Sequence, residues 1–327
     1  MTAFSGPLAA QFEQFATLMR STGAQHVNLL ANVHRLDRFL ADTHPDATTL
    51  TKDILTSWFA SFAHLLPESQ KRYRSATFQV CKYLRRRDPN TATREQFEPL
   101  RSPRVFKPHI FSHEAIRTIL EAARQLQPRP SDPMRPRSME LVIVLLYTAG
   151  LRVGEAARLQ VRDYDAELGT LLIRETKFAK TRLVPLSSTA KRTVDMYLED
   201  RRRHGISCKS EDPLKCCPGG RPPSVGSIQI ALTRLMRRCG VKPARGRGPR
   251  IHDIRHAFAV HCVQEWYRQG SDVQALLPDL ATYMGHRGLE YTQRYLSLTP
   301  AVLHAASARF EHRWQTHADV ELEGAES

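Results

Sequence analysis

The sequence lacks the long apolar stretches and leader-like segments that mark membrane and secreted proteins. No apolar run approaches the roughly 20 residues that span a bilayer. The longest one, Leu141–Leu151, reads as a buried helix. The N-terminus has no basic flank before an apolar stretch, so no secretory signal is expected. We therefore expect a cytoplasmic location and no membrane partner.

Signatures of metal and nucleotide binding are also missing. The six cysteines form no CxxC pair, and Cys216 and Cys217 are adjacent, which favours reduced, scattered thiols over disulfide or zinc sites. The sequence contains no Walker motif and no acidic metal cluster. We therefore expect neither a metal nor another cofactor.

Acidic residues are scarce relative to basic ones. The 327 residues contain 48 Lys and Arg but only 33 Asp and Glu, a formal net charge of +15. Such a surplus is typical of proteins whose partner is an anionic polymer or an anionic membrane. Because a membrane partner is not expected, nucleic acid is the favoured partner.

The chain is long enough for two domains, since single domains commonly have about 100–200 residues. Apolar residues recur at helical spacing in four segments of the N-terminal part. These are Leu8–Met19, His26–Leu40, Leu50–Leu65 and Glu68–Leu84, with Thr49 or Thr51 as a cap of the third helix. We expect a helical domain over 1–98, a basic linker over 99–111, a second domain over 112–317 and an acidic, disordered tail over 318–327.

The fourth predicted helix is strongly basic, with aromatic residues between its charges. A solvated basic helix end would have the same composition, but the charge of the whole chain favours contact with the DNA backbone. The residues expected to make that contact are Arg72, Arg74, Lys82, Arg85, Arg86 and Arg87.

The second domain combines helices with a small antiparallel β-element, so the predicted fold class is mainly α. Ser112 is placed to cap its first helix, and Ser138–Thr148 should be a buried helix ending near Gly150. Leu168–Glu175 and Arg182–Leu186 are rich in Leu, Ile and Val and predict two strands joined by a turn.

Two patches in this domain could hold a phosphodiester. Gly150 permits a sharp turn that would present Arg152 at a helix start, with Glu155 one turn later. The turn between the strands carries Lys177 and Lys180. Taken alone, an Arg–Glu pair is usually structural and a turn lysine is usually solvated.

A third and a fourth patch are more specific. His252, Arg255 and His256 occupy one face of a helix, because they lie three and four residues apart. A zinc site is disfavoured, since the glutamate of an HExxH motif is absent and Arg255 would repel a cation. Downstream, His286 is followed after nine residues by Tyr295.

The order and spacing of these patches resemble the tyrosine recombinase (phage integrase) family, including its Xer-like and mobile-element members. The matching features are GLRxxE, a lysine in a β-hairpin, HxxRH, GH and a tyrosine nine residues later. The resemblance covers about Ser112–Arg313. It implies a tyrosine recombinase catalytic domain, and by position alone it implies a helical, SAM-like core-binding domain that clamps DNA.

The resemblance also implies a role for each residue. Arg152 and Arg255 would hold the phosphate oxygens, His286 would donate a hydrogen bond to the phosphate, and Tyr295 would be the nucleophile. Lys177 fits the register of the general acid, with Lys180 as the competitor, and His252 would be the base. Glu155 and His256 would be supporting residues.

The implied function is site-specific DNA recombination through a 3′-phosphotyrosyl intermediate, without metal or ATP. The implied partners are duplex recombination sites and further protomers in a tetramer, with or without partner recombinases. Integration or transposition of a mobile element is favoured because of two unusual segments, Gly205–Pro223 and Glu265–Pro278. The alternatives are a type IB topoisomerase-like enzyme and a catalytically silent DNA-binding protein. Pro300–Trp314 reads as an amphipathic helix that docks on a neighbouring protomer or on its own domain.

Overall fold

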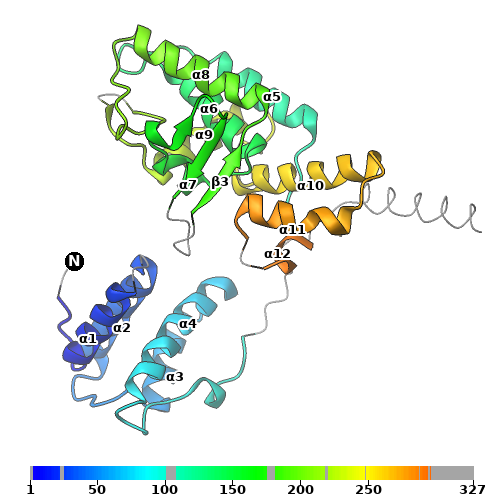
Figure 1. Cartoon of the computed structure of the whole chain (residues 1–327). Helices are drawn as coiled ribbons and strands as arrows, with labels where there is room; N and C mark the ends of the chain where they lie inside the picture. The colour runs from blue at the N-terminus through cyan, green and yellow to red at the C-terminus, as the bar shows by residue number, and fades with distance from the viewer. Residues whose placement is uncertain are drawn as a thin grey trace, which may run out of the picture. The chain divides into compact units, whose positions relative to one another are not determined.

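The computed structural model describes residues 3–22, 26–100, 108–174, 181–217, 220–246, 248–286, 288–293 and 295. These residues form two compact units, one over 3–100 and the other over 108–295. Figure 1 shows the first unit from blue to cyan and the second from green to orange. The predicted helix Pro300–Trp314 and the predicted tail 318–327 lie outside the described residues, as does most of the predicted linker.

The first unit is a small helical domain, as its sequence pattern predicted. Its helices are α1 (Ala9–Ser21), α2 (Val27–Thr43), α3 (Lys52–Ser61) and α4 (Pro67–Leu84), followed by the short 3-10 helix η1 (Arg94–Gln96). Helix α4 packs against α1 and α2 around a core of Phe and Leu side chains. Thr51 caps α3 by accepting a hydrogen bond from the Ile54 N–H at 3.4 Å, whereas Thr49 bonds to Thr91.

A buried helix organises the second unit. Helix α6 (Arg135–Thr148) has an unbroken buried run from Glu140 to Leu146, which explains why its sequence shows little helical amphipathicity. It packs against α5 (His113–Arg124), α8 (Ser188–Arg203) and α10 (His252–Arg268). Ser112 caps α5, as predicted, by accepting a hydrogen bond from the Ala115 N–H at 3.1 Å.

The β-element is antiparallel, as predicted, but it has three strands where the sequence indicated two. Its order is β1 (Tyr164–Asp165), β2 (Thr170–Ile173) and β3 (Arg182–Pro185), with Leu171 opposite Val184. Strand β1 was missed because two residues are too few to show alternation. The buried side chains of β2 and β3 join the core beside α6.

The unusual segment Gly205–Pro223 follows α8 and contains no α-helix or β-strand among its described residues. Its backbone is held by Arg201, a buried residue near the end of α8. The Arg201 guanidinium donates to the carbonyls of Ser207, Pro213 and Leu214. A buried arginine thus satisfies carbonyls that have no strand partner. The six cysteines are all unpaired.

The remaining helices of the second unit carry most of the sequence motifs. They are α7 (Val153–Arg158), α9 (Val225–Arg238), α10, α11 (Val273–Met284) and the short α12 (Glu290–Gln293), with the 3-10 helix η2 (Val161–Asp163) after α7. The second unusual segment, Glu265–Pro278, comprises the end of α10 and half of α11, and Pro278 lies inside that helix. No helix within the described ranges is long and apolar enough to cross a membrane.

Gly150 makes the turn between α6 and α7 in a left-handed conformation, with φ of 58°. A Cβ placed there would lie 2.7 Å from the Phe258 ring, which packs against the turn. Gly205 has a similar φ of 66°, but a Cβ at that position would meet nothing within 4 Å.

We expect Gly150→Ala to lower the free energy of unfolding by at least about 1 kcal/mol more than Gly205→Ala does. Both substitutions place alanine at positive φ, but only the first also overpacks the core. Urea unfolding of the full-length variants measures the difference. Equal losses would show that the contact with Phe258 relaxes freely.

Candidate active site

The turn at Gly150 places Arg152 at the N-cap of α7 and Glu155 in the first turn of that helix, as predicted. The Arg152 N–H donates to Glu155 Oε2 at 2.9 Å, and Arg152 Nη1 donates to Oε1 at 2.7 Å. Arg152 Nη2 also donates to the Gly285 carbonyl at 3.1 Å. The Arg152 side chain stays 29% exposed, so part of its guanidinium can still meet a ligand.

Arg255 lies on α10 and is buried. Its Nη1 donates to the Gly150 carbonyl and its Nη2 to the Met284 carbonyl at 2.5 Å. The guanidinium therefore joins the end of α6, α10 and the end of α11. Burial, followed by the charge of Arg152, lowers the pKa of Arg255 to about 9, so it stays protonated at neutral pH.

Arg182, at the start of β3, belongs to the same cluster and was not among the predicted site residues. Its Nη1 and Nη2 donate to Glu155 Oε1 and Oε2 at 3.1 and 2.9 Å, and its Nε donates to the Tyr283 carbonyl at 2.9 Å. One signal could have identified it: residues 177–182 read K-x-x-K-x-R, the family register in which Lys177 fits the general acid, and Arg182 is the arginine of that register.

Glu155 is the shared partner of all three arginines. Its side chain is 2% exposed, and Arg255 Nη1 lies 3.9 Å from Oε2 in addition to the bonds above. Burial alone would raise the pKa of this carboxyl. The hydrogen bonds and charge of Arg182, then the Arg152 N–H and the charge of Arg255, instead lower it to about 2. Glu155 is therefore a carboxylate at every physiological pH.

His286 follows the left-handed Gly285 that ends α11. Its Nδ1 lies 2.7 Å from Oγ1 of Thr292, which is fully buried in α12. This bond fixes the orientation of the imidazole and leaves Nε2 available to a ligand. Thr292 is a second residue that the sequence motifs did not reveal, since a lone threonine before a tyrosine has no distinguishing pattern.

Tyr295 is 2% exposed and packs in a small core formed by α10 and α11. Its hydroxyl lies 3.0 Å from Nδ1 of His256. The His252 ring lies edge-on to His256, with 4.8 Å between their centroids. His252 was the predicted base and His256 a supporting residue, but the side chain placed against the tyrosine hydroxyl is His256.

The three imidazoles of the site are neutral at pH 7. Burial and the charges of Arg255 and Arg152 lower the pKa of His286 to about 3. Burial, then His252, lowers the pKa of His256 to about 4. The pKa of His252 falls to about 4 through burial and the charges of Arg255 and Arg250.

The two lysines of the predicted general acid, Lys177 and Lys180, lie outside the described residues. The strand that follows them in the sequence, β3, is described. It begins at Arg182, whose side chain is part of the arginine cluster. The strand that comes directly after the lysines is therefore anchored to Glu155.

The six basic residues predicted on and after α4 differ in their surroundings. Arg74 lies over the Phe59 ring and donates to the Glu98 carbonyl at 3.1 Å, and Arg85 donates to the Thr91 carbonyl at 2.8 Å. Arg87 bonds to Gln14 and lies over Tyr83. The other three are exposed and, within the described residues, make no side-chain hydrogen bond or ion pair: Arg72, Lys82 and Arg86.

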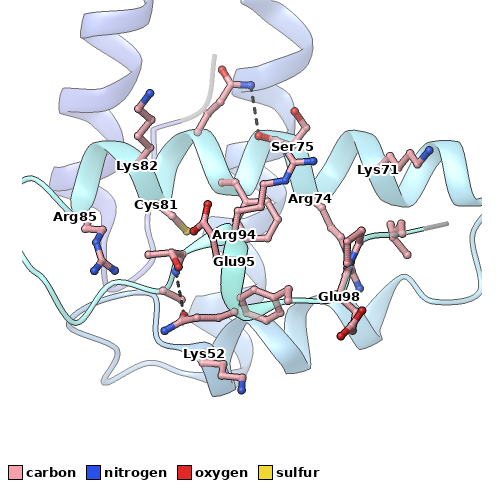
Figure 2. A pocket seen from close by; sticks show the side chains of 18 residues that line it. Lys52, Lys71, Arg74, Ser75, Cys81, Lys82, Arg85, Arg94, Glu95 and Glu98 are labelled. Carbon is pink, nitrogen blue, oxygen red and sulfur yellow. Dashed lines mark hydrogen bonds between the residues drawn. The ribbon is translucent and has the colours of Figure 1, made fainter. Parts of the chain in front are cut away.

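A concavity of about 1430 Å³ lies between α4 and the segment around η1. Figure 2 shows basic side chains around it, some of which the sequence motifs did not single out. Its basic lining residues are Lys52, Lys71, Arg74, Lys82, Arg85 and Arg94. Glu95 and Glu98 also line it, so this surface is basic with a minority of acidic groups.

Comparison with known proteins identifies the family of the chain. Residues 109–301 match the phage integrase family. The chain is 30% identical to the integrase/recombinase y4rE of Sinorhizobium fredii over 309 residues, which cover 94% of this chain and 97% of that protein. It is 36% identical to the integrase/recombinase y4rB of the same organism over 215 residues, 65% of this chain and 68% of that protein.

Solved structures show the same fold. The Tn1549 transposon integrase in complex with a circular intermediate DNA has a TM-score of 0.66 at 15% identity, covering 92% of this chain and 99% of that one. A lambda integrase dimer bound to a core site has a TM-score of 0.63 at 16% identity, covering 89% and 95%. The chain belongs to the phage integrase family of tyrosine recombinases.

Neutral histidines in the folded protein make its stability depend on pH. Unfolded histidine has a pKa near 6.5, whereas His252, His256, His286 and also His261 lie at about 4 or below when folded. The unfolded chain therefore binds more protons between these values. Their contribution to stability is complete above about pH 6.5 and is lost as the pH falls toward 4.

We expect the unfolding temperature of the full-length protein without DNA to fall by on the order of 5 °C between pH 7 and pH 5.5. His286→Gln, which cannot be protonated, should fall less over the same range. Scanning calorimetry measures both. A flat profile, or equal slopes for the two proteins, would contradict neutral histidines in the folded state.

Proposed function

We propose that the chain is a site-specific DNA recombinase that cleaves and rejoins DNA strands through a 3′-phosphotyrosyl bond at Tyr295. One observation carries this proposal: Arg152, Arg255, His256, His286 and Tyr295, from four separate segments, meet at one site. Two guanidiniums with unused donors and a tyrosine hydroxyl against a neutral imidazole suit the attack of a phenol on a phosphodiester.

The proposed reaction is a transesterification. The Tyr295 oxygen attacks phosphorus while its proton passes to His256, and the bond from phosphorus to the 5′-oxygen breaks. Lys177, or Lys180 in its place, donates a proton to that leaving oxygen. Arg152, Arg255 and His286 bind the non-bridging oxygens, on which negative charge builds. A 5′-hydroxyl from another strand then attacks the phosphotyrosine and restores both the phosphodiester and the tyrosine.

This chemistry uses the chain's own residues, with no metal or ATP, because the phosphotyrosine bond conserves the energy of the phosphodiester. Tyr295 is 2% exposed, so its hydroxyl must turn outward from the core before attack. We infer that DNA binding triggers this turn, since an arriving phosphate introduces acceptors for the arginines that lie next to Tyr295.

We further propose that the helical unit 3–100 clamps duplex DNA with its basic surface. Arg72, Lys82 and Arg86 are the best candidates for phosphate contacts, because their charges are exposed and uncommitted within the described residues. Arg74, Arg85 and Arg87 have partners within the chain, so they are weaker candidates.

The biological setting proposed for the enzyme is integration or transposition of a mobile element by a cytoplasmic tetramer on DNA, with or without a partner recombinase. Two structural neighbours support this proposal. A transposon integrase supports the role in a mobile element, and a lambda integrase tetramer bound to a Holliday junction supports the tetramer.

Tyr295→Phe should bind DNA as the wild type does but form no covalent complex. A nicked duplex carrying the protein's own flanking DNA ends traps the intermediate, and mass spectrometry locates the nucleotide adduct. A stable adduct in Tyr295→Phe, or an adduct on another residue of the wild type, would overturn the assignment. Rejoining to a second duplex distinguishes a recombinase from a topoisomerase-like enzyme, and absence of any adduct would favour a silent DNA-binding protein.

A sulfur substitution identifies the general acid. A 5′-bridging phosphorothiolate releases a thiolate that needs no proton, so it should restore cleavage by Lys177→Ala to within about tenfold of wild type. Lys180→Ala is the matched control and should show no such gain. Rescue of Lys180→Ala alone would assign the role to Lys180.

A further inference from the structure

We propose that Arg182 is a positioning residue that neutralises Glu155, so that Arg152 and Arg255 keep their positive charge available to the scissile phosphate. The proposal rests on the proposed function and adds a residue to its site. Arg182 makes a two-bond contact with Glu155, and its side chain is 8% exposed. It faces the carboxylate and the Tyr283 carbonyl, not solvent.

The three arginines differ in how many of their N–H donors already bind acceptors within the protein. A guanidinium has five N–H donors. Arg182 commits three of its donors to Glu155 and Tyr283. Arg152 commits two side-chain donors, to Glu155 and Gly285, and Arg255 commits two, to Gly150 and Met284. Arg152 and Arg255 thus keep three donors each for phosphate oxygens.

Charge arithmetic explains why a third arginine is needed. Arg152, Arg182, Arg255 and Glu155 sum to +2, since the neighbouring histidines are neutral. A phosphodiester carries one negative charge, and the phosphorane formed by phenolate attack carries two before protonation. The arginine cluster alone offsets that charge, and the proton that His256 takes from Tyr295 adds one further positive charge beside it. Without Arg182 the sum is +1, and the phosphate must compete with an unneutralised carboxylate for Arg152.

The glycine of the GH motif, Gly285, leaves the space that the Arg182 guanidinium occupies. A Cβ on Gly285 would lie 2.8 Å from Arg182 Nη1, so a side chain at this position would displace the guanidinium. Gly285 also has a φ of 67° and offers its carbonyl to Arg152. The glycine before His286 therefore serves both arginines as well as the turn that ends α11.

A loss of charge at Arg182 should affect the transition state more than the bound ground state, because the negative charge on the phosphate grows during attack. We expect Arg182→Gln to slow single-turnover cleavage about 100-fold, in the range seen when one stabilising donor is removed. DNA affinity should change by less than about threefold, since most affinity comes from other phosphate contacts. Arg182→Lys, which keeps the charge, should retain more activity than Arg182→Gln.

The decisive experiment compares two substrates. A methylphosphonate at the scissile position replaces one charged oxygen by a methyl group, so its reaction demands one positive charge less. The deficit of Arg182→Gln should shrink at least tenfold on this substrate. A 5′-bridging phosphorothiolate should not rescue the variant. An equal deficit on phosphate and methylphosphonate would overturn the charge role, and thiolate rescue would show that Arg182 acts through the general-acid lysine.

Two further variants separate charge from folding. Arg174→Gln, directly after β2, is the matched control, because it breaks an arginine bond to the buried Asp163 and no bond to Glu155. It should cleave within about threefold of wild type. The double variant Glu155→Gln with Arg182→Gln returns the cluster to +2 and should cleave faster than Arg182→Gln alone. A slower double variant would contradict the arithmetic.

The outcomes also distinguish this proposal from the proposed function. Adduct formation by wild type together with unchanged cleavage by Arg182→Gln would overturn only the role of Arg182. Absence of a Tyr295 adduct in wild type would overturn both. If Arg182→Gln fails to fold, Arg182→Lys is compared on the two substrates instead. Because lysine keeps the charge, the charge role predicts that this variant has the wild-type preference between phosphate and methylphosphonate.

Discussion

The buried carboxylate of Glu155 is the interaction on which the catalytic unit depends. It accepts hydrogen bonds from Arg152 and Arg182 and lies close to Arg255. These residues come from α7, β3 and α10, so one carboxylate joins three elements distant in the sequence. Burying it would be costly without such partners, and so would burying the guanidiniums of Arg182 and Arg255 without it. The group that stabilises the fold is therefore also the group that assembles the proposed phosphate site.

Hydrogen bonds from buried arginines to backbone carbonyls at helix ends and in loops are a second feature that recurs in this unit. Arg255 is held by the carbonyls of Gly150 and Met284, where α6 and α11 end. Arg201 is held in the same way by the loop after α8. Carbonyls at helix ends and in loops lack backbone partners, and a buried guanidinium satisfies several of them at once. This explains how a protein with a small sheet holds irregular segments in place.

The neutral histidines complement the arginine cluster. Burial keeps His252, His256 and His286 deprotonated, and the charges of neighbouring guanidiniums add to the effect, because a protonated imidazole beside them would be repelled. A neutral imidazole at the Tyr295 hydroxyl can accept its proton. Arrival of an anionic phosphate would reduce the repulsion and raise these pKa values, which couples substrate binding to proton transfer.

Much of this protein is determined by its sequence alone. Helical periodicity located α1–α4, and the unbroken apolar run identified α6 as buried, because these signals are local. The spaced motifs predicted the family, and the residues they singled out, Arg152, Arg255, His286 and Tyr295, lie close together in the structure. Strand β1 had no such signal, because it is two residues long and exists only through pairing with β2.

The tertiary structure alone decided how the charges are shared. The sequence contains 48 basic residues, and apart from the place of Arg182 in the K-x-x-K-x-R register, nothing local distinguishes it, bound to Glu155, from exposed Arg72. Nor does it indicate that His256 lies at the Tyr295 hydroxyl, since both histidines of the HxxRH motif share one helical face. Partners of a charged side chain are set by long-range packing. A motif therefore predicts which groups react, and only the fold decides which partner each group has.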